Sequence, residues 1–141
     1  MNSVSILLLA YNEAPTITSE IESWSWMLDN AEVEIDYEII LVEDGSTDGT
    51  TIILENLHRQ GKIIHLHEKI RAGYNNALMR GISRSSKDYI FLSDTGQKND
   101  LMDFWALWLR RNTADLIVGK KAFRSDPVQR QILTKLLNAL D

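Results

Sequence analysis

A short acidic segment places the strongest constraint on how this chain can fold. Between Glu38 and Thr50 the sequence is Glu-Ile-Ile-Leu-Val-Glu-Asp-Gly-Ser-Thr-Asp-Gly-Thr, so an apolar, β-branched run stops abruptly at two carboxylates. Such a run is typical of a buried strand in a parallel sheet. Ligands of open α/β sheets bind just beyond the carboxyl ends of the strands. We therefore predict that Glu43 and Asp44 face a binding crevice.

The rest of the chain alternates predicted strands with predicted helices. Strands that alternate with helices form a largely parallel sheet with helices on both faces. We therefore predict an α/β, Rossmann-like nucleotide-binding fold in a single domain, residues 1–141. The predicted strands are 4–9, 38–42, 62–66, 89–92 and 114–118, and the predicted helices are 17–28, 48–57, 72–83 (with Ala77, Leu78 and Ile82 inward), 100–108 and one starting at 126.

Composition excludes several classes of protein. The chain has no cysteine, which excludes disulfides and thiolate metal sites and suits a reducing, cytoplasmic compartment. Its longest apolar run, Ile6 to Ala10, is too short to span a bilayer. The net charge of −5 argues against nonspecific nucleic-acid binding. Basic side chains gather after residue 109, either as a solvated helix face or as a phosphate-binding patch.

Two strand ends carry motifs of a known family. The first strand is followed by Tyr11-Asn12-Glu13, and the second by Glu43-Asp44-Gly-Ser. These segments resemble the opening turn and the first acidic motif of family 2 glycosyltransferases, although Glu43 stands where that family usually has Asp. The resemblance implies a GT-A fold in which Asp44 accepts hydrogen bonds from the base and ribose of the donor nucleotide. The donor-binding residues it implies here are Ala10, Tyr11, Glu13, Glu43 and Asp44.

Residues 68–81 resemble the start of a helix in the same family, where a basic residue and a glycine precede Ala-Leu. A helix N-terminus presents free N–H groups to an anion. The resemblance implies that Arg71 and Gly73 contact the donor, with Arg71 adding a fork of donors to the diphosphate. Alternatives without a ligand stay open, because Asn12 also suits a turn, Asp48 a helix cap, and Arg71 a solvated loop.

The fourth strand ends in Ser93-Asp94-Thr95-Gly96-Gln97, where the family normally carries Asp-x-Asp. In the family two carboxylates hold a divalent cation on the diphosphate, since hard oxygen ligands suit Mg²⁺ or Mn²⁺. Here Asp94 matches the first Asp and Gly96 the second; shifting the register by one puts Ser93 and Thr95 there instead. The resemblance thus implies a weakened metal site of Asp94 and Gln97, with a simple Asp turn as the alternative.

The segment from Leu116 to Arg130 resembles the polyprenyl-phosphate branch of the family, in which basic groups meet the phosphate of a lipid-linked acceptor. The resemblance implies that Lys121, Arg124 and Arg130 bind an acceptor phosphate or a membrane surface, although Lys121 lacks the fork of an arginine. The three histidines have no predicted site. His65 and His67 point to one side of a strand, but no third ligand is spaced to complete a zinc site.

The predicted function is inverting transfer of a sugar from a nucleotide diphosphate to a lipid-phosphate or glycan acceptor of the cell envelope. Family 2 domains also contain acceptor-binding elements and an Asp general base, which we expect beyond residue 141. We therefore expect the chain alone to bind donor without turnover, and the full-length protein to be membrane-associated. Uncovered apolar surface near the last helix further predicts self-association into homo-oligomers.

Other functional classes fit the residues less well. A catalytically inactive nucleotide-binding or scaffold module is the main alternative, because Gly96 removes a metal ligand. A phosphoacceptor receiver domain shares the length and the alternation, and Lys120 suits it, but it needs an acidic pair after the first strand. A dinucleotide dehydrogenase needs Gly-x-Gly-x-x-Gly at that point, and this motif is absent.

Overall fold

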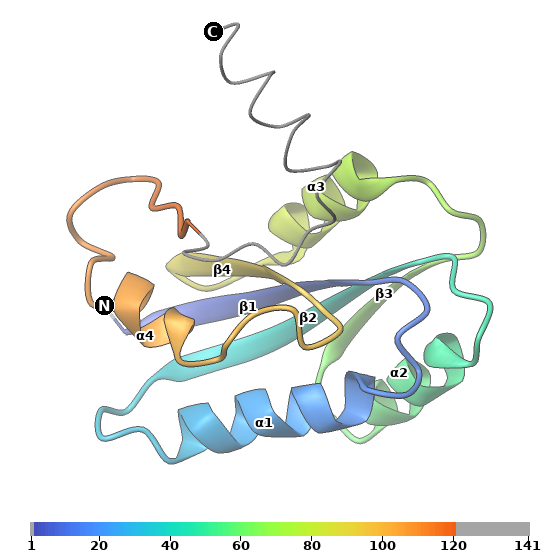
Figure 1. Ribbon diagram of the computed structural model, residues 1–141, viewed down its shortest axis with the longest axis horizontal. Coiled ribbons are helices and arrows are strands. Elements are labelled where there is room, and N and C mark those ends of the chain that lie inside the picture. Colours follow the sequence, from blue (N-terminus) through green and yellow to red (C-terminus); the bar gives the residue numbers. More distant parts are fainter. Residues whose placement is uncertain (1, 121–141) are drawn as a thin grey trace, which may run out of the picture. The chain divides into compact units, whose positions relative to one another are not determined.

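A four-stranded parallel sheet forms the centre of the protein (Figure 1). The computed structural model describes residues 2–120, and the strand order is β3-β2-β1-β4. The α/β alternation predicted from the sequence is confirmed as far as the fourth helix. The elements are β1 (Ser3–Ala10), α1 (Ile17–Asp29), β2 (Asp36–Asp44), α2 (Thr50–Arg59), β3 (Ile64–Glu68), α3 (Tyr74–Arg84), β4 (Tyr89–Asp94) and α4 (Asp103–Trp108).

Helices cover both faces of the sheet, as predicted. Helices α1 and α2 lie on one face and α3 on the other (Figure 1). Successive side chains of a strand point to opposite faces. Leu7, Ile40 and Val42 therefore form a buried cluster with Ala77 of α3, while their sequence neighbours face the other layer. Burial on both sides explains the aliphatic runs Ile6–Leu9 of β1 and Ile39–Val42 of β2.

Helix α3 approaches the sheet closely through small residues. Ala77 and Gly81 are its buried residues, four positions apart on one helix face. A Cβ on Gly81 would lie 2.3 Å from a methyl carbon of Leu7, so a larger residue there would force the Leu7 side chain or the helix to move. Ile82 is 40% exposed, and the prediction that it points inward is wrong. The helix turns Gly81 toward the sheet instead.

An aromatic cluster joins α1 and the start of α4 to the edge strand β4. The ring centroid of Trp24 lies 5.5 Å from that of Phe91 and 5.8 Å from that of Phe104. Phe91 and Phe104 lie 5.1 Å apart in an edge-to-face arrangement, which aromatic rings favour. The predicted apolar face of α1, which contains Trp24, is buried as expected.

The predicted fifth strand at 114–118 is not formed. These residues have no regular secondary structure, and Leu116 and Val118 are 80% and 77% exposed. A short apolar run becomes a strand only by pairing with a sheet edge, and within residues 2–120 no strand pairs with it. By its contacts the chain divides into two units, Met1–Ala106 and Leu107–Asp141, and this segment belongs to the second. The predicted helix from 126 lies outside the described residues.

Among the described helices, none has the length and apolar character needed to cross a membrane.

Candidate functional site

The carboxyl ends of the four parallel strands lie along one edge of the sheet, and all four motifs singled out in the sequence meet there. In the ladder, Ala10 of β1 lies beside Glu43 of β2, and Leu9 lies beside Asp94 of β4. We call this edge the rim. It consists of residues 10–13, 43–50, 68–74 and 94–97.

The turn after β1 is bonded directly to the loop after β2. Asn12 has a left-handed backbone, φ 54°, which Asn tolerates better than most residues. Its Oδ1 accepts a hydrogen bond from the N–H of Thr47 at 2.7 Å. The N–H groups of Asn12 and Glu13 donate to the hydroxyls of Ser46 and Thr50, each at 3.0 Å. Asn12 therefore fixes the turn and ties two motifs into one structure.

The Asp44 carboxylate is held by the loop that precedes α3. Its Oδ1 accepts a hydrogen bond from the N–H of Ala72 at 2.6 Å, and its Oδ2 accepts one from the N–H of Gly73 at 3.0 Å. Arg71 Nε lies 3.8 Å from Asp44 Oδ2, and the Arg71 guanidinium lies 4.1 Å from the ring centroid of Tyr11. The structure thus brings Tyr11, Asp44 and Arg71 into contact.

The loop after β2 has further structural roles. Gly45 has φ 68°, and a Cβ there would lie 2.6 Å from the backbone N of Arg71, so the two loops cross with no room for a side chain. Asp48 accepts hydrogen bonds from the N–H groups of Thr50, the first residue of α2, and of Ala14, both at 3.1 Å. Asp48 thus supports the start of a helix, the role that its position in the sequence suggests.

Asp94 lies exposed at the end of β4. Within the described residues no hydrogen bond or ion pair engages its carboxylate, and none links it to the Gln97 side chain. Burial, aided by the negative charge of Asp94, raises the pKa of Tyr74, so Asp94 faces the start of α3 electrostatically. The adjacent Thr95 is buried and donates from its hydroxyl to the carbonyl of Leu9 at 3.0 Å, which anchors the loop to β1.

Glu13 occupies the space beside Gly96, which one of the two registers considered above aligns with the second Asp of the resembling family. Gly96 has φ 85°, and a Cβ there would lie 2.8 Å from each carboxylate oxygen of Glu13. Lys98 Nζ lies 3.9 Å from Glu13 Oε1. The turn after β1 therefore places a carboxylate against the loop after β4, where position 96 itself offers none.

Glu20 of α1 supports the same loop. It is 8% exposed, and its Oε2 accepts hydrogen bonds from the N–H groups of Gly96 at 2.9 Å and Gln97 at 3.3 Å. Burial raises the pKa of Glu20, the charge of Glu13 adds to this effect, and the two hydrogen bonds oppose it. Sequence reasoning missed Glu20. Its position on the apolar face of α1, three residues after Ile17, was the available signal.

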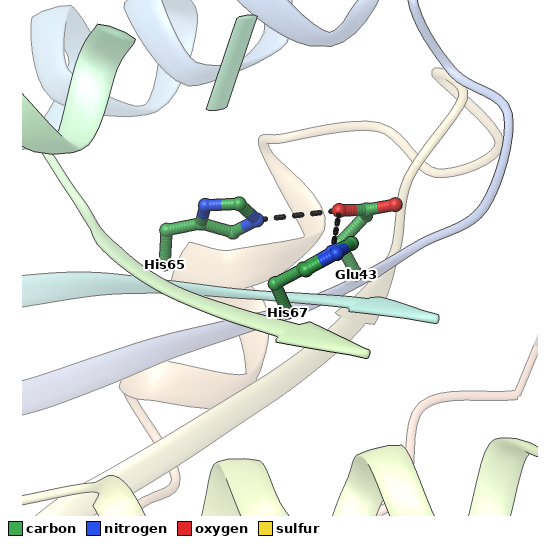
Figure 2. Close-up of side chains that lie close together, drawn as sticks. All are labelled: Glu43, His65 and His67. Atoms are coloured by element: carbon green, nitrogen blue, oxygen red, sulfur yellow. Dashed lines mark hydrogen bonds and ion pairs between the residues drawn. The ribbon is translucent and has the colours of Figure 1, made fainter. Parts of the chain in front are cut away.

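Glu43 does not face the crevice, contrary to the prediction made for it. It is fully buried on the α2 side, because adjacent residues of a strand point to opposite faces. The β2–β3 register places His67 opposite Glu43, and Glu43 Oε2 lies 2.7 Å from His67 Nδ1 and 3.4 Å from His65 Nε2 (Figure 2). The prediction that no third ligand joins the two histidines is therefore also wrong. The carboxylate comes from the neighbouring strand.

The second oxygen of Glu43 is bonded as well. Oε1 accepts hydrogen bonds from the N–H of Ser46 at 2.7 Å and from the hydroxyl of Thr51 at 3.0 Å. Burial favours the protonated form of Glu43, but the hydrogen bonds from Ser46, His67 and Thr51 outweigh it and lower its pKa. Burial lowers the pKa of His65, and the nearby charge of Glu43 opposes this shift only in part. The lowered pKa of Glu43 favours its ionised form, and the lowered pKa of His65 favours its neutral form.

Other regions lie apart from this group. Lys121, Arg124 and Arg130 lie outside the described residues. A hollow of about 720 Å³ between α1 and the amino-terminal ends of β2 and β3 includes Ile21, Tyr37 and Ile63 in its lining. It lies at the end of the sheet opposite the rim and involves none of the motif residues.

The substitution Glu20→Gln tests the electrostatics beneath the rim. The amide oxygen of the variant can accept both backbone hydrogen bonds, while the charge near Glu13 is removed. The pKa of Glu20 is higher in the folded state than the value of 4.5 expected for the unfolded chain. Ionised Glu20 therefore lowers the free energy of unfolding as the pH rises above 4.5, and protonated Glu20 at lower pH does not. In urea unfolding at neutral pH, we expect the free energy of unfolding of the variant to equal or exceed that of the wild type. Below pH 4.5, where Glu20 is protonated, any such difference should disappear.

The exposed Glu22 on the same helix provides a matched control, and Glu22→Gln should change stability little under either condition. A Glu20→Gln variant that is clearly less stable than the wild type at neutral pH would contradict this description of the charge.

Residues 5–95 match the family model described as Glycosyl transferase family 2. The chain is 25% identical over 143 residues to an undecaprenyl-phosphate 4-deoxy-4-formamido-L-arabinose transferase of Proteus mirabilis, an alignment that covers 99% of this chain and 43% of that protein. It is 32% identical over 99 residues to the Glycosyltransferase AglD of Haloferax volcanii, covering 70% and 16% respectively. The chain thus spans less than half the length of these relatives.

Two solved structures share the GT-A α/β fold. One is S. aureus TarS 1-349 in complex with UDP, with a TM-score of 0.60 and 20% identity over 89% of this chain and 38% of that chain. The other is the mannosyltransferase PcManGT from Pyrobaculum calidifontis in complex with GDP-Man and Mn²⁺, with a TM-score of 0.52 and 23% identity over 64% and 26%. Because the family match covers most of the chain and reaches all four strands, this chain belongs to the family 2 glycosyltransferases.

Proposed function

We propose that this chain is the donor-binding part of an inverting glycosyltransferase that moves a sugar from a nucleotide diphosphate to a lipid-phosphate or glycan acceptor of the cell envelope. The observation that carries the proposal is the joint contact of Tyr11, Asp44 and Arg71 at the rim of a family 2 domain. The similar proteins support it, since one relative is an undecaprenyl-phosphate sugar transferase and the two similar structures are complexes with UDP or with GDP-Man.

The base and ribose of the donor are proposed to bind at Tyr11 and Asp44. Each carboxylate oxygen has two acceptor sites. The hydrogen bonds from Ala72 and Gly73 therefore orient Asp44 while leaving acceptor capacity for an imide N–H or a ribose hydroxyl. Tyr11 is 37% exposed and adds an aromatic surface beside that carboxylate.

The diphosphate is proposed to lie between Arg71, the start of α3 and Asp94. The Arg71 side chain is 63% exposed, and the first turn of α3 presents N–H groups that suit an anion. A Mg²⁺ or Mn²⁺ ion held by Asp94, by the side-chain oxygen of Gln97 and by phosphate oxygens would neutralise the leaving group. With one protein carboxylate, the ion should bind chiefly together with the nucleotide.

The acceptor is proposed to bind through parts of the protein that the described residues do not include. Lys121, Arg124 and Arg130 would meet the phosphate of a lipid-linked acceptor, or a membrane surface on the cytoplasmic side. The general base belongs in the further length that the relatives possess. Ile90 and Leu92 on the edge strand β4 are 42% and 41% exposed, which supports the proposed self-association.

Calorimetric titration of the chain with UDP or GDP-mannose, in Mn²⁺ or in EDTA, tests donor binding. We expect one of the two ligands to bind, and Mn²⁺ to strengthen that binding. Asp44→Asn should weaken binding at least tenfold, about 1.4 kcal/mol, because charged hydrogen bonds to the nucleotide are lost. Asp94→Asn should remove the effect of Mn²⁺ and leave metal-free binding unchanged.

Asp103→Asn, at an exposed carboxylate of α4, is the control and should bind as the wild type does. The absence of binding by either nucleotide at millimolar concentration would contradict the proposal. Binding that Mn²⁺ does not change would favour the alternative of an inactive nucleotide-binding module, which Gly96 supports.

Restoring the second family carboxylate should not restore a metal site. In Gly96→Asp the new side chain meets the Glu13 carboxylate and takes a left-handed backbone, so we expect the free energy of unfolding to fall by about 1–3 kcal/mol. Gly96→Asn is the matched control, since it lacks the charge and Asn tolerates positive φ, and it should lose less. A Gly96→Asp variant that keeps full stability and binds Mn²⁺ more tightly would contradict this account.

A further inference from the structure

Three metal-ligating side chains converge on the α2 side of the sheet (Figure 2). Glu43, His65 and His67 each offer one ligand atom, and these atoms all lie within 4.8 Å of one another. They project from the neighbouring strands β2 and β3, so the register of the ladder sets their positions. Within residues 2–120 no other trio of His and acidic side chains is as close.

The burial and bonding of His65 provide a second observation that points to a ligand of this cluster. The His65 side chain is 4% exposed, and it points toward Glu43 (Figure 2). Its Nε2 makes no hydrogen bond within the described residues, and Glu43 Oε2, to which the dashed line in Figure 2 runs, lies 3.4 Å away. A buried polar atom without a partner is costly, and few remain in native proteins without a reason. The imidazole nitrogens of histidine are the commonest protein ligands of transition metals.

We propose that Glu43, His65 and His67 bind a zinc-class divalent cation, at a site separate from the Mg²⁺ or Mn²⁺ at Asp94. Two imidazoles and one carboxylate suit Zn²⁺, whereas Mg²⁺ prefers oxygen ligands alone. The proposal uses only the geometry of this cluster, and it stands whether or not the rim binds a sugar nucleotide.

The two distances from the Glu43 carboxylate to the imidazoles suit a tetrahedral site after a small movement of His67. Zinc bonds of about 2.0–2.1 Å place neighbouring ligand atoms about 3.3 Å apart. His65 Nε2 and Glu43 Oε2 already lie 3.4 Å apart. His67 Nδ1 lies 2.7 Å from the same oxygen, and would move away by about 0.6 Å as its hydrogen bond is replaced by metal bonds. The His67 side chain is 33% exposed, so it has room to move. A water molecule could then reach the ion from solvent as the fourth ligand.

The surroundings of Glu43 favour a fixed ligand. Its other oxygen is held by the N–H of Ser46 and the hydroxyl of Thr51, and such outer contacts orient metal ligands. A bound ion would therefore link the ends of β2 and β3 with the loop that leads into α2. Because Asp44 follows Glu43 directly, this link would stiffen the rim from the opposite face of the sheet.

Titration of the metal-free chain with Zn²⁺, Mg²⁺ and Co²⁺ tests the proposal. We expect one Zn²⁺ per chain, a tetrahedral Co²⁺ absorption spectrum, and no Mg²⁺ binding to this cluster. His65→Gln and His67→Asn place an amide near the lost Nε2 and Nδ1, so each removes an imidazole with little change of shape. Each should weaken Zn²⁺ binding at least tenfold. His58→Gln, outside the cluster, should retain the wild-type affinity.

Thermal unfolding in EDTA establishes that each variant folds without metal. If one variant does not fold, the other variant and the wild-type Co²⁺ spectrum still decide. The proposal is overturned if the wild-type chain binds no Zn²⁺ at micromolar concentration, if Co²⁺ gives only a weak octahedral spectrum, or if folded His65→Gln and His67→Asn bind Zn²⁺ as tightly as the wild type.

Discussion

The hydrogen bonds from the Ala72 and Gly73 N–H groups to the Asp44 carboxylate determine how the rim is assembled. They draw the loop before α3 across the end of β2, where Gly45 leaves no side chain in its path. This crossing brings Arg71 beside Asp44 and over Tyr11. A single oriented carboxylate therefore connects three segments distant in sequence, and any ligand of the rim meets groups whose positions are already set.

The neighbouring carboxylate, Glu43, lies on the other face of the sheet and stabilises a different set of contacts. Adjacent side chains of a strand point to opposite faces of the sheet, so Glu43 and Asp44 at the end of β2 lie in two different environments. Asp44 is 7% exposed and is held by the loop before α3, whereas Glu43 is fully buried and bonded to the start of its own loop, to α2 and to His67. The β2–β3 register places this carboxylate beside the imidazoles of β3.

The sequence pattern predicts the layers of the fold well, because apolar runs and helical spacing report burial directly. It fails where structure depends on pairing between segments. The run at 114–118 is as apolar as a strand, yet it has no partner edge within the described residues. The cluster of Glu43 with His65 and His67 depends on the β2–β3 register, which residue spacing does not contain. Likewise, the approach of Glu13 to Gly96 depends on how two loops meet.

Amide hydrogen exchange of the chain, with and without a bound nucleotide in Mn²⁺, tests the central claim most directly. The account predicts that slower exchange is confined to the rim, residues 10–13, 43–50, 68–74 and 94–97, and to the first turn of α3, while the amino-terminal ends of the strands are unchanged. Protection concentrated at the hollow between α1 and the starts of β2 and β3, with the rim unaffected, would contradict it.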